Sequence, residues 1–344
     1  MIKGSFTALI TPFIEQEVDY EGLQQLTEFQ IASGISGILA VGTTGESPTL
    51  SWEEHNRVIE HVAAACKTRC FCIAGTGSNN TSEALSAAKH AAKAGVDAVL
   101  MVDPYYNGPS SLEIRREYIE PVAREFPDLP IIPYVIPGRT GAQLLPEDLA
   151  LLAAEYPNVR TVKEATGNLD NMKRTRACCG KNYTILSGDD ALTYDMMTLA
   201  DIQAEGVISV MSNIAPKAVA EMVALLRAGK TAEALRWKNA LDPLFQLVTV
   251  KTTENTRFGE VVCRARNPLA VKTIMAAIGM PAGGCRRPLG KMTLAGLTKV
   301  FDTCRDVWAK TPEVFQPAAE FFQIDMAARL NDRKYWEGLY YKEY

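Results

Sequence analysis

Histidine is scarce in this chain: His55, His61 and His90 are the only three among 344 residues. All three fall in stretches with helical periodicity, away from the ends of the apolar runs described below. This placement argues against a Ser-His-Asp triad and against a histidine-ligated metal centre. We therefore expect no metal at the active site.

Long apolar runs and paired cysteine motifs are also missing. No stretch approaches the ~18 consecutive apolar residues of a membrane span. The apolar run before Pro12 is too short for the core of a signal peptide. The eight cysteines include no C-x-x-C pair, which argues against a zinc ribbon or a thioredoxin-like motif. We expect reduced cysteines and a cytoplasmic protein that does not bind membranes.

An excess of charge of either sign is absent as well. The 36 Lys and Arg residues nearly balance 40 Asp and Glu residues, for a net charge of −4. This balance argues against broad binding to nucleic acid. A composition of 47% hydrophobic and 22% charged residues is typical of a soluble globular enzyme. One or two local cations would still suffice to bind a small anionic substrate.

Short apolar runs, each followed by an amphipathic stretch, repeat along the first two-thirds of the chain. Runs that suit buried parallel strands lie at 5–10, 37–41, 70–74, 97–102, 131–135, 159–163, 183–187 and 206–210. Helical spacing follows them at 19–33, 51–66, 80–94, 111–126, 146–156, 168–178, 190–200 and 215–228. Eight such units predict an α/β protein with a closed (β/α)8 TIM barrel over residues 1–228. An open doubly wound sheet is disfavoured, because no G-x-G-x-x-G follows the first run.

The apolar runs fade after about residue 230, and we predict a helical C-terminal domain at 229–344. Helical spacing covers 231–249, 268–279 and much of 293–309, whereas the polar segment 250–266 is expected to be a loop. The tail carries these aromatic residues: Phe315, Phe321, Phe322, Tyr335, Trp336, Tyr340, Tyr341 and Tyr344. Disordered tails are usually poor in aromatics. We therefore expect the tail to pack on the barrel or on a partner subunit.

Lys163 closes the sixth apolar run, and active sites of such barrels form at the C-terminal ends of the strands. Its side chain should enter the mouth of the barrel, where burial lowers the pKa of an amine. A neutral amine is what attack on a ketone requires. The alternative is a structural lysine that is ion-paired with Glu164. Alternation along a strand should turn Glu164 to the opposite face, so we predict that Lys163 forms a Schiff base.

Other polar residues follow the same apolar runs. Thr43 and Thr44 offer hydroxyl and backbone N–H groups to a carboxylate, and Tyr106 and Tyr134 can pass protons. Arg139 can grip a second carboxylate through its planar fork. Each also has an ordinary structural interpretation as a turn, core or surface residue. Their joint position at the top of the barrel favours a site.

Two adjacent acids, Asp189 and Asp190, follow the seventh apolar run. They could bind magnesium, but no second acidic cluster stands at another strand end. We therefore expect them to cap the helix that follows.

Seven segments carry a resemblance to a known family. They are GTTGES (42–47), DPYYNGPS (103–110), YVIPGRTG (134–141), KEATGNL (163–169), LSGDDA (186–191), GVISV (206–210) and NPLAVK (267–272). Together and in this order they resemble the dihydrodipicolinate synthase family of class I aldolases. The resemblance runs from residue 4 to about residue 300. It implies condensation of pyruvate with L-aspartate 4-semialdehyde to 4-hydroxy-tetrahydrodipicolinate, in lysine biosynthesis.

The resemblance also implies roles for the catalytic residues. Lys163 would form an imine with pyruvate, so no cofactor would be needed, and loss of a methyl proton would give the enamine that attacks the aldehyde. Tyr134, Thr44 and Tyr106 would form a proton relay. Tyr106 would reach into the site of a neighbouring subunit, in a homodimer or homotetramer.

Substrate contacts follow from the same resemblance. Thr43, Thr44, Ile208 and Gly188 would line the pyruvate position. Arg139 would stand at the entrance and attract the carboxylate of the semialdehyde. Sister aldolases that act on N-acetylneuraminate or sugar acids lack an arginine at that point, which favours the synthase.

Regulation is a further implication, because many members of the family are inhibited by L-lysine. The positions that would contact it are Ser47, Trp52, His55, Asn79, Glu83 and Tyr105. The alternative is that His55 and Glu83 are ordinary helix residues.

The chain departs from the family at several places. Val135 replaces the usual Asn after the catalytic tyrosine, and the loop at 200–205 looks longer than usual. The insert at 250–266 and the tail at 305–344 are additional, so the oligomer is left open. Two other functions also stay open: a sister pyruvate-dependent aldolase, and a non-catalytic barrel that binds a keto acid.

Overall fold

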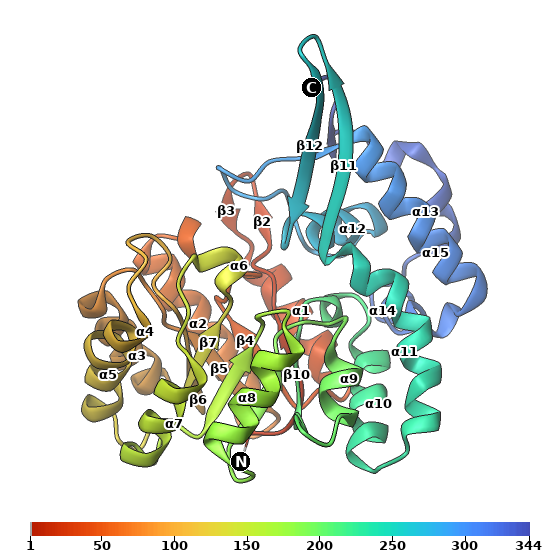
Figure 1. The fold of residues 1–344 in the computed structure, drawn as a ribbon. Helices are drawn as coiled ribbons and strands as arrows, with labels where there is room; N and C mark the ends of the chain where they lie inside the picture. The colour runs from red at the N-terminus through yellow and green to blue at the C-terminus, as the bar shows by residue number, and fades with distance from the viewer. Residues whose placement is uncertain (1) are drawn as a thin grey trace.

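The computed structural model describes residues 2–344 and contains a closed barrel of parallel strands (Figure 1). Around the barrel the strands run in the order β1-β10-β9-β8-β7-β6-β5-β4. Their bounds are β1 (Gly4–Ala8), β4 (Gly37–Ala40), β5 (Phe71–Gly75), β6 (Ala98–Val102), β7 (Ile131–Val135), β8 (Thr161–Glu164), β9 (Thr184–Ser187) and β10 (Gly206–Ser209). Each overlaps one of the eight apolar runs, so the predicted TIM barrel is confirmed.

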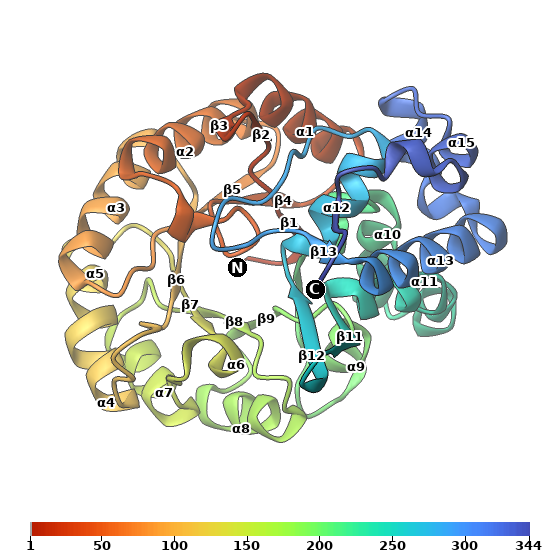
Figure 2. The same cartoon turned by 90° about the horizontal axis from the view of Figure 1, so that it is seen from above.

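Helices surround the barrel as an outer ring, which is clearest from above (Figure 2). Their bounds are α1 (Tyr20–Ala32), α2 (Trp52–Cys66), α3 (Thr81–Ala94), α4 (Ser111–Glu113), α5 (Glu120–Glu125), α7 (Pro146–Glu155), α8 (Leu169–Cys179), α9 (Thr193–Thr198) and α10 (Pro216–Arg227). The short helix α6 (Pro137–Thr140) lies inside this ring, at the strand ends (Figure 2). A π-helical segment, Ile114–Ile119, joins α4 to α5. Among residues 2–344 we find no helix with the length and apolar character needed to cross a bilayer.

Alternation along the strands divides the apolar core into two parts. One part fills the inside of the barrel, and its larger buried members are Phe6, Leu39, Ile73, Leu100, Ile132, Tyr134, Leu186 and Ile208. The other lies between the strands and the helices, with residues such as Phe29, Val62 and Ile185. The inner core fills the barrel axis, so open space for a ligand is left only near the strand ends.

The C-terminal part begins with α11 (Thr231–Phe245), which packs against α10. The helices α12 (Leu269–Ile278), α13 (Leu294–Lys310), α14 (Gln316–Phe321) and α15 (Met326–Asn331) follow. The three helices predicted from periodicity are thus present. The predicted domain boundary at residue 228 falls in the turn between α10 and α11, and independent folding of the two parts stays a prediction.

The prediction of a loop at 250–266 is wrong. This segment forms an antiparallel hairpin of β11 (Thr249–Thr256) and β12 (Gly259–Arg266), which projects from the body of the protein (Figure 1). Threonine and valine favour strands. One face of the hairpin is partly buried, but threonine and glutamate lie on that face as well, so the sequence lacks the clear apolar–polar alternation of a half-buried strand.

The aromatic tail packs on the rest of the chain. Phe321 and Phe322 lie against Phe29 of α1, with ring centroids 5.3 and 5.1 Å away. Trp336 stacks on Phe301 of α13 at 4.1 Å. The last strand, β14 (Tyr340–Tyr341), pairs with β13 (Met292–Thr293). The predicted packing of the tail on the barrel is confirmed.

Candidate active site

Lys163 and Tyr134 stand side by side at the mouth of the barrel. They are partners in the register between β8 and β7, so their side chains share the inner face. The Lys163 Nζ lies 4.2 Å from the centre of the Tyr134 ring, and only 5% of the lysine is exposed. Burial lowers the pKa of Lys163 to about 7; the carboxylate of Asp190 opposes this shift and the cation of Arg139 adds to it. A large share of the amine is therefore neutral near pH 7.

Glu164, the alternative partner of Lys163, points to the opposite face of β8. Its carboxylate accepts hydrogen bonds from the Thr166 N–H at 2.7 Å and from the Asn171 side chain at 2.8 Å. The expected alternation is therefore present, and the ion pair between Lys163 and Glu164 is not formed. The lysine amine is left available for chemistry.

Gly188 makes room for the stem of Lys163. A Cβ atom at this position would lie 3.0 Å from Cγ and Cε of Lys163 and 2.8 Å from the Cβ of Ala165. Real Cβ atoms rarely come this close, so any larger residue would displace the lysine. Ile208 on β10 faces the same interior, in one buried cluster with Tyr134 and Leu186.

A cavity of about 200 Å³ opens at the strand ends next to this pair. Its wall consists of Val41, Gly42, Thr43, Ser47, Pro48, Gly75, Gly77, Leu100, Val102, Tyr105, Tyr134, Arg139 and Thr140. Burial raises the pKa of Tyr134, while the cation of Arg139 and a hydrogen bond with Thr43 oppose that rise. A neutral tyrosine hydroxyl that contacts a second hydroxyl can both donate and accept a proton.

The two threonines of the 42–47 turn point in different directions. Thr43 lines the cavity and contacts Tyr134. Thr44 is 2% exposed, lies outside the cavity wall, and its hydroxyl accepts a hydrogen bond from the Asn267 side chain at 3.0 Å. In this structure Tyr134 contacts Thr43, and the role of Thr44 in the relay stays a prediction.

The backbone on both sides of this turn is unusual. Val41 and Glu46 have φ values of +47° and +56°, in the left-handed region that non-glycine residues rarely adopt. Such conformations persist where the surrounding structure fixes them. Gly75 allows the close approach, because a Cβ there would lie 2.4 Å from the Val41 carbonyl oxygen.

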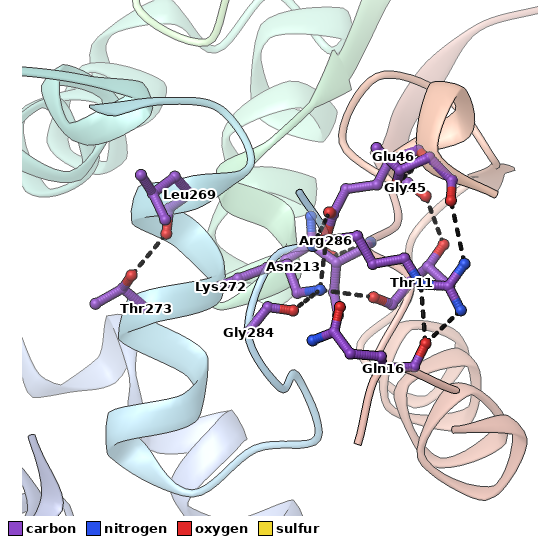
Figure 3. A network of polar contacts seen from close by, with 12 residues as sticks. Thr11, Gln16, Gly45, Glu46, Asn213, Leu269, Lys272, Thr273, Gly284 and Arg286 are labelled. Atoms are coloured by element: carbon purple, nitrogen blue, oxygen red, sulfur yellow. Dashed lines mark hydrogen bonds and ion pairs between the residues drawn. The ribbon is translucent and has the colours of Figure 1, made fainter. Parts of the chain in front are cut away.

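A buried polar network holds the 42–47 turn through Glu46 (Figure 3). The Lys272 amine donates to the Glu46 carboxylate at 2.7 Å and to the carbonyl oxygens of Thr11 and Gly284 at 2.9 and 3.1 Å. The second oxygen of Glu46 accepts a hydrogen bond from the backbone N–H of Arg286 at 2.8 Å. Residues of the C-terminal part therefore hold a turn that belongs to the barrel.

Asp190 does not cap the following helix, so that prediction is wrong. The N-cap of α9 is Leu192, without a side-chain cap. The Asp190 carboxylate instead accepts from the backbone N–H groups of Val210 and Met211, at 3.0 and 2.9 Å. Burial raises the pKa of Asp190 to about 6. The acid holds the end of β10 and acts on the charge of Lys163.

Comparison with known proteins shows which family the chain belongs to. Residues 1–306 match the model of the dihydrodipicolinate synthetase family. The chain belongs to this family. The 4-hydroxy-tetrahydrodipicolinate synthase of Geotalea daltonii is 41% identical over 306 residues, which cover 89% of this chain and 99% of the relative.

Solved structures agree with the family assignment. The synthase of Methylacidiphilum fumariolicum SolV has a TM-score of 0.82 at 36% identity, covering 92% of this chain and 100% of that one. The enzyme of Cyanidioschyzon merolae, solved with lysine bound, has a TM-score of 0.80 at 34% identity, covering 89% and 98%. The predicted family, barrel and class of lyase are confirmed, with the family's role in lysine biosynthesis. Residues 307–344 lie beyond the family match.

Tyr106, another predicted catalytic residue, lies away from the cavity. Its side chain is 86% exposed and does not line the cavity. The neighbouring Tyr105 does line it. The predicted role of Tyr106 in the site of a neighbouring subunit stays a prediction.

The residues predicted to contact L-lysine gather beside the cavity. Ser47 and Tyr105 form part of its wall, and the Asn79 side chain accepts from the Tyr105 N–H at 2.6 Å. Burial and the nearby carboxylate of Glu83 raise the pKa of Tyr105. The ring of Trp52 stands edge-on to His55, with the centroids 5.1 Å apart. His55 is buried, and burial lowers its pKa to about 4.

Proposed function

We propose that this chain condenses pyruvate with L-aspartate 4-semialdehyde to form 4-hydroxy-tetrahydrodipicolinate, with Lys163 as the nucleophile. One observation carries the proposal: a buried amine at the barrel mouth beside a tyrosine, with no ion-pair partner among residues 2–344 and a pKa lowered to about 7. The names of the relatives support this choice of substrates. The absence of a metal or cofactor from the reaction, and a cytoplasmic location, remain predictions.

The first half of the reaction forms the imine. The neutral Lys163 amine attacks the keto carbon of pyruvate, and the resulting carbinolamine loses water. Tyr134 donates a proton to the leaving oxygen and is reprotonated through Thr43, which the contact between them favours over Thr44. Backbone N–H groups of the 42–47 turn are suited to hold the pyruvate carboxylate.

The second half forms the carbon–carbon bond. The imine loses a methyl proton and becomes an enamine, whose terminal carbon attacks the aldehyde carbon while the aldehyde oxygen takes up a proton. The amino group of the semialdehyde then attacks the imine carbon, which closes the ring and releases the Lys163 amine. The balance is one pyruvate and one semialdehyde to one product and one water.

Substrate contacts follow from the placement of the remaining residues. Ile208 and Gly188 border the pyruvate position next to Lys163. Arg139 in the cavity wall would bind the carboxylate of the semialdehyde through charge-assisted hydrogen bonds. Tyr106 of a partner subunit would complete the relay, which requires at least a homodimer.

Borohydride reduction in the presence of pyruvate tests the nucleophile. We expect a mass gain that maps to Lys163 by peptide analysis, and none at other lysines. A chain that binds a keto acid without catalysis would give no adduct. An assay of aspartate semialdehyde against N-acetylneuraminate then decides between the synthase and a sister aldolase, and preferential cleavage of the sugar acid would exclude the synthase.

Feedback inhibition by L-lysine is part of the proposal. It rests on the group of Ser47, Asn79, Glu83 and Tyr105 beside the cavity and on the relative solved with lysine bound. We expect millimolar L-lysine to reduce turnover and a Glu83→Gln variant to weaken this effect. Full activity of the unaltered protein at that concentration would contradict the proposal.

A further inference from the structure

Two arginines approach each other where the hairpin β11–β12 meets the barrel. The Arg266 Nη1 donates to the carbonyl oxygen of Gly138 at 3.1 Å, and the Arg139 Nη2 donates to the carbonyl oxygen of Asn267 at 3.1 Å. The residue pairs 138–139 and 266–267 are thus joined by two hydrogen bonds, one donated from each pair. The contact brings a residue of the inserted hairpin to the entrance of the active site.

Neither guanidinium has an acidic partner among residues 2–344. Each makes a single hydrogen bond within the described chain, although an arginine has five N–H donors. Both side chains are partly buried, and the pKa of Arg139 is lowered by burial and by the nearby cation of Arg266. Two adjacent cations with unused donors repel each other in the free protein. An anion between them would relieve this repulsion.

The base of the hairpin also contacts the opposite wall of the site. Asn267 follows Arg266 directly, and its side chain donates to Thr44 in the 42–47 turn at 3.0 Å. Residues 266–267 are therefore fixed against both the pyruvate side and the entrance side. Arg266 therefore has a fixed position, unlike a freely moving surface side chain.

We propose that Arg266 is a specificity-determining residue that, together with Arg139, forms a two-guanidinium site for the carboxylate of the aldehyde substrate. This inference rests on the proposed function. The added charge attracts an anionic aldehyde and gives its carboxylate a second donor. The same positive charge disfavours the protonated form of the substrate's amine, which must be neutral to close the ring.

Steady-state kinetics of Arg266→Ala test the proposal, with Arg257→Ala at the hairpin tip as a control of equal charge change. We expect the KM for aspartate semialdehyde to rise about tenfold in Arg266→Ala, as for the loss of one charge-assisted hydrogen bond. The KM for pyruvate and kcat should stay within about twofold of the unaltered protein. Arg257→Ala should change none of these values, and Arg266→Lys should recover most of the loss.

Several outcomes would overturn this role of Arg266. An unchanged KM for the aldehyde, or equal rises for both substrates, would contradict it. A fall in kcat alone would show that Arg266 only positions the turn at 138–139. Borohydride trapping with pyruvate is measured in parallel: failure in the unaltered protein would sink the proposed function, whereas normal trapping with an unchanged aldehyde KM would sink Arg266 alone. Circular dichroism checks folding, and Arg266→Gln replaces an alanine variant that does not fold.

Discussion

Two buried lysines in different regions of the molecule have opposite environments. At the barrel mouth, Lys163 is 5% exposed, faces an aromatic ring, and forms no ion pair within the described part of the chain. At the junction with the C-terminal part, Lys272 is 1% exposed and has three oxygen partners, including the Glu46 carboxylate at 2.7 Å. Burial lowers the pKa of both amines, and in Lys272 the carboxylate opposes that effect.

The difference shows that burial alone does not make a lysine reactive. Three acceptors fix the Lys272 ammonium and use all three of its donors. Lys163 has no such set, so its neutral form is accessible near pH 7 and can act as a nucleophile. One region uses a buried amine to hold structure, and the other keeps an amine available for chemistry.

The largest expected effect is a loss of turnover when Lys163 at the barrel mouth is replaced. Lys163→Ala should lower turnover by roughly 10³-fold or more, because the covalent route is lost. The fold should persist, as circular dichroism would show. Substantial turnover, or a pyruvate adduct that forms on Lys272, would break the contrast.

Loss of the second lysine should affect stability. Lys272→Met leaves the Glu46 carboxylate buried without its cation, which should reduce the free energy of unfolding by about 3–5 kcal/mol. Chemical denaturation measures this change. Lys310→Met, which removes an exposed pair with Asp306, should change the stability by less than about 1 kcal/mol. Equal losses in the two variants would show that the network does not stabilise the fold.

The pH dependence of imine formation sharpens the comparison. The rate of trapping with pyruvate should rise through about pH 7 and then level, because the Lys163 amine loses its proton there. A midpoint near the usual lysine pKa of 10.5 would contradict the lowered value.

The same shift affects stability. The folded protein releases this proton near pH 7, whereas the unfolded chain keeps it up to about the usual 10.5. Between these values the unfolded state binds more protons, so stability rises with pH. Lys163→Met should therefore be more stable than the unaltered protein at or below pH 7, and the gain should shrink as the pH rises. Denaturation at several pH values measures it; a gain that grows with pH would contradict this assignment.

The smallest expected effect concerns Asp190. Its carboxylate raises the pKa of Lys163, so Asp190→Asn should move the midpoint of trapping to lower pH by less than about one unit. Asp189→Asn serves as the adjacent control and should leave the midpoint nearly unchanged. A shift to higher pH in Asp190→Asn would show that another group controls the amine.

Periodicity predicted most of the fold, because buried strands and amphipathic helices leave regular apolar patterns. It failed at 250–266, where the partly buried face of the hairpin carries polar residues such as Thr252 and Glu254 and so leaves no apolar alternation in the sequence. Aromatic residues predicted that the tail packs, but not that Phe321 and Phe322 meet Phe29. Contacts between segments this far apart in sequence depend on the completed fold.

The site was predicted unevenly for a similar reason. The directions of Lys163 and Glu164 follow from strand alternation. Those of Thr43 and Thr44 do not, because Val41 has a positive φ and the chain turns there. Asn267, which fixes Thr44, stands 223 residues away in sequence. Sequence order gives no hint of that contact.

The pairing of Glu46 with Lys272 has a consequence for the timing of synthesis. The two residues are 226 positions apart, so the carboxylate leaves the ribosome long before its cation exists. A nascent barrel that ends near residue 228 must keep Glu46 hydrated, since a lone buried carboxylate is too unfavourable. The turn at 42–47 therefore gains the cation that holds it only when the last third of the polypeptide docks, so we expect catalytic competence to appear only after translation is complete.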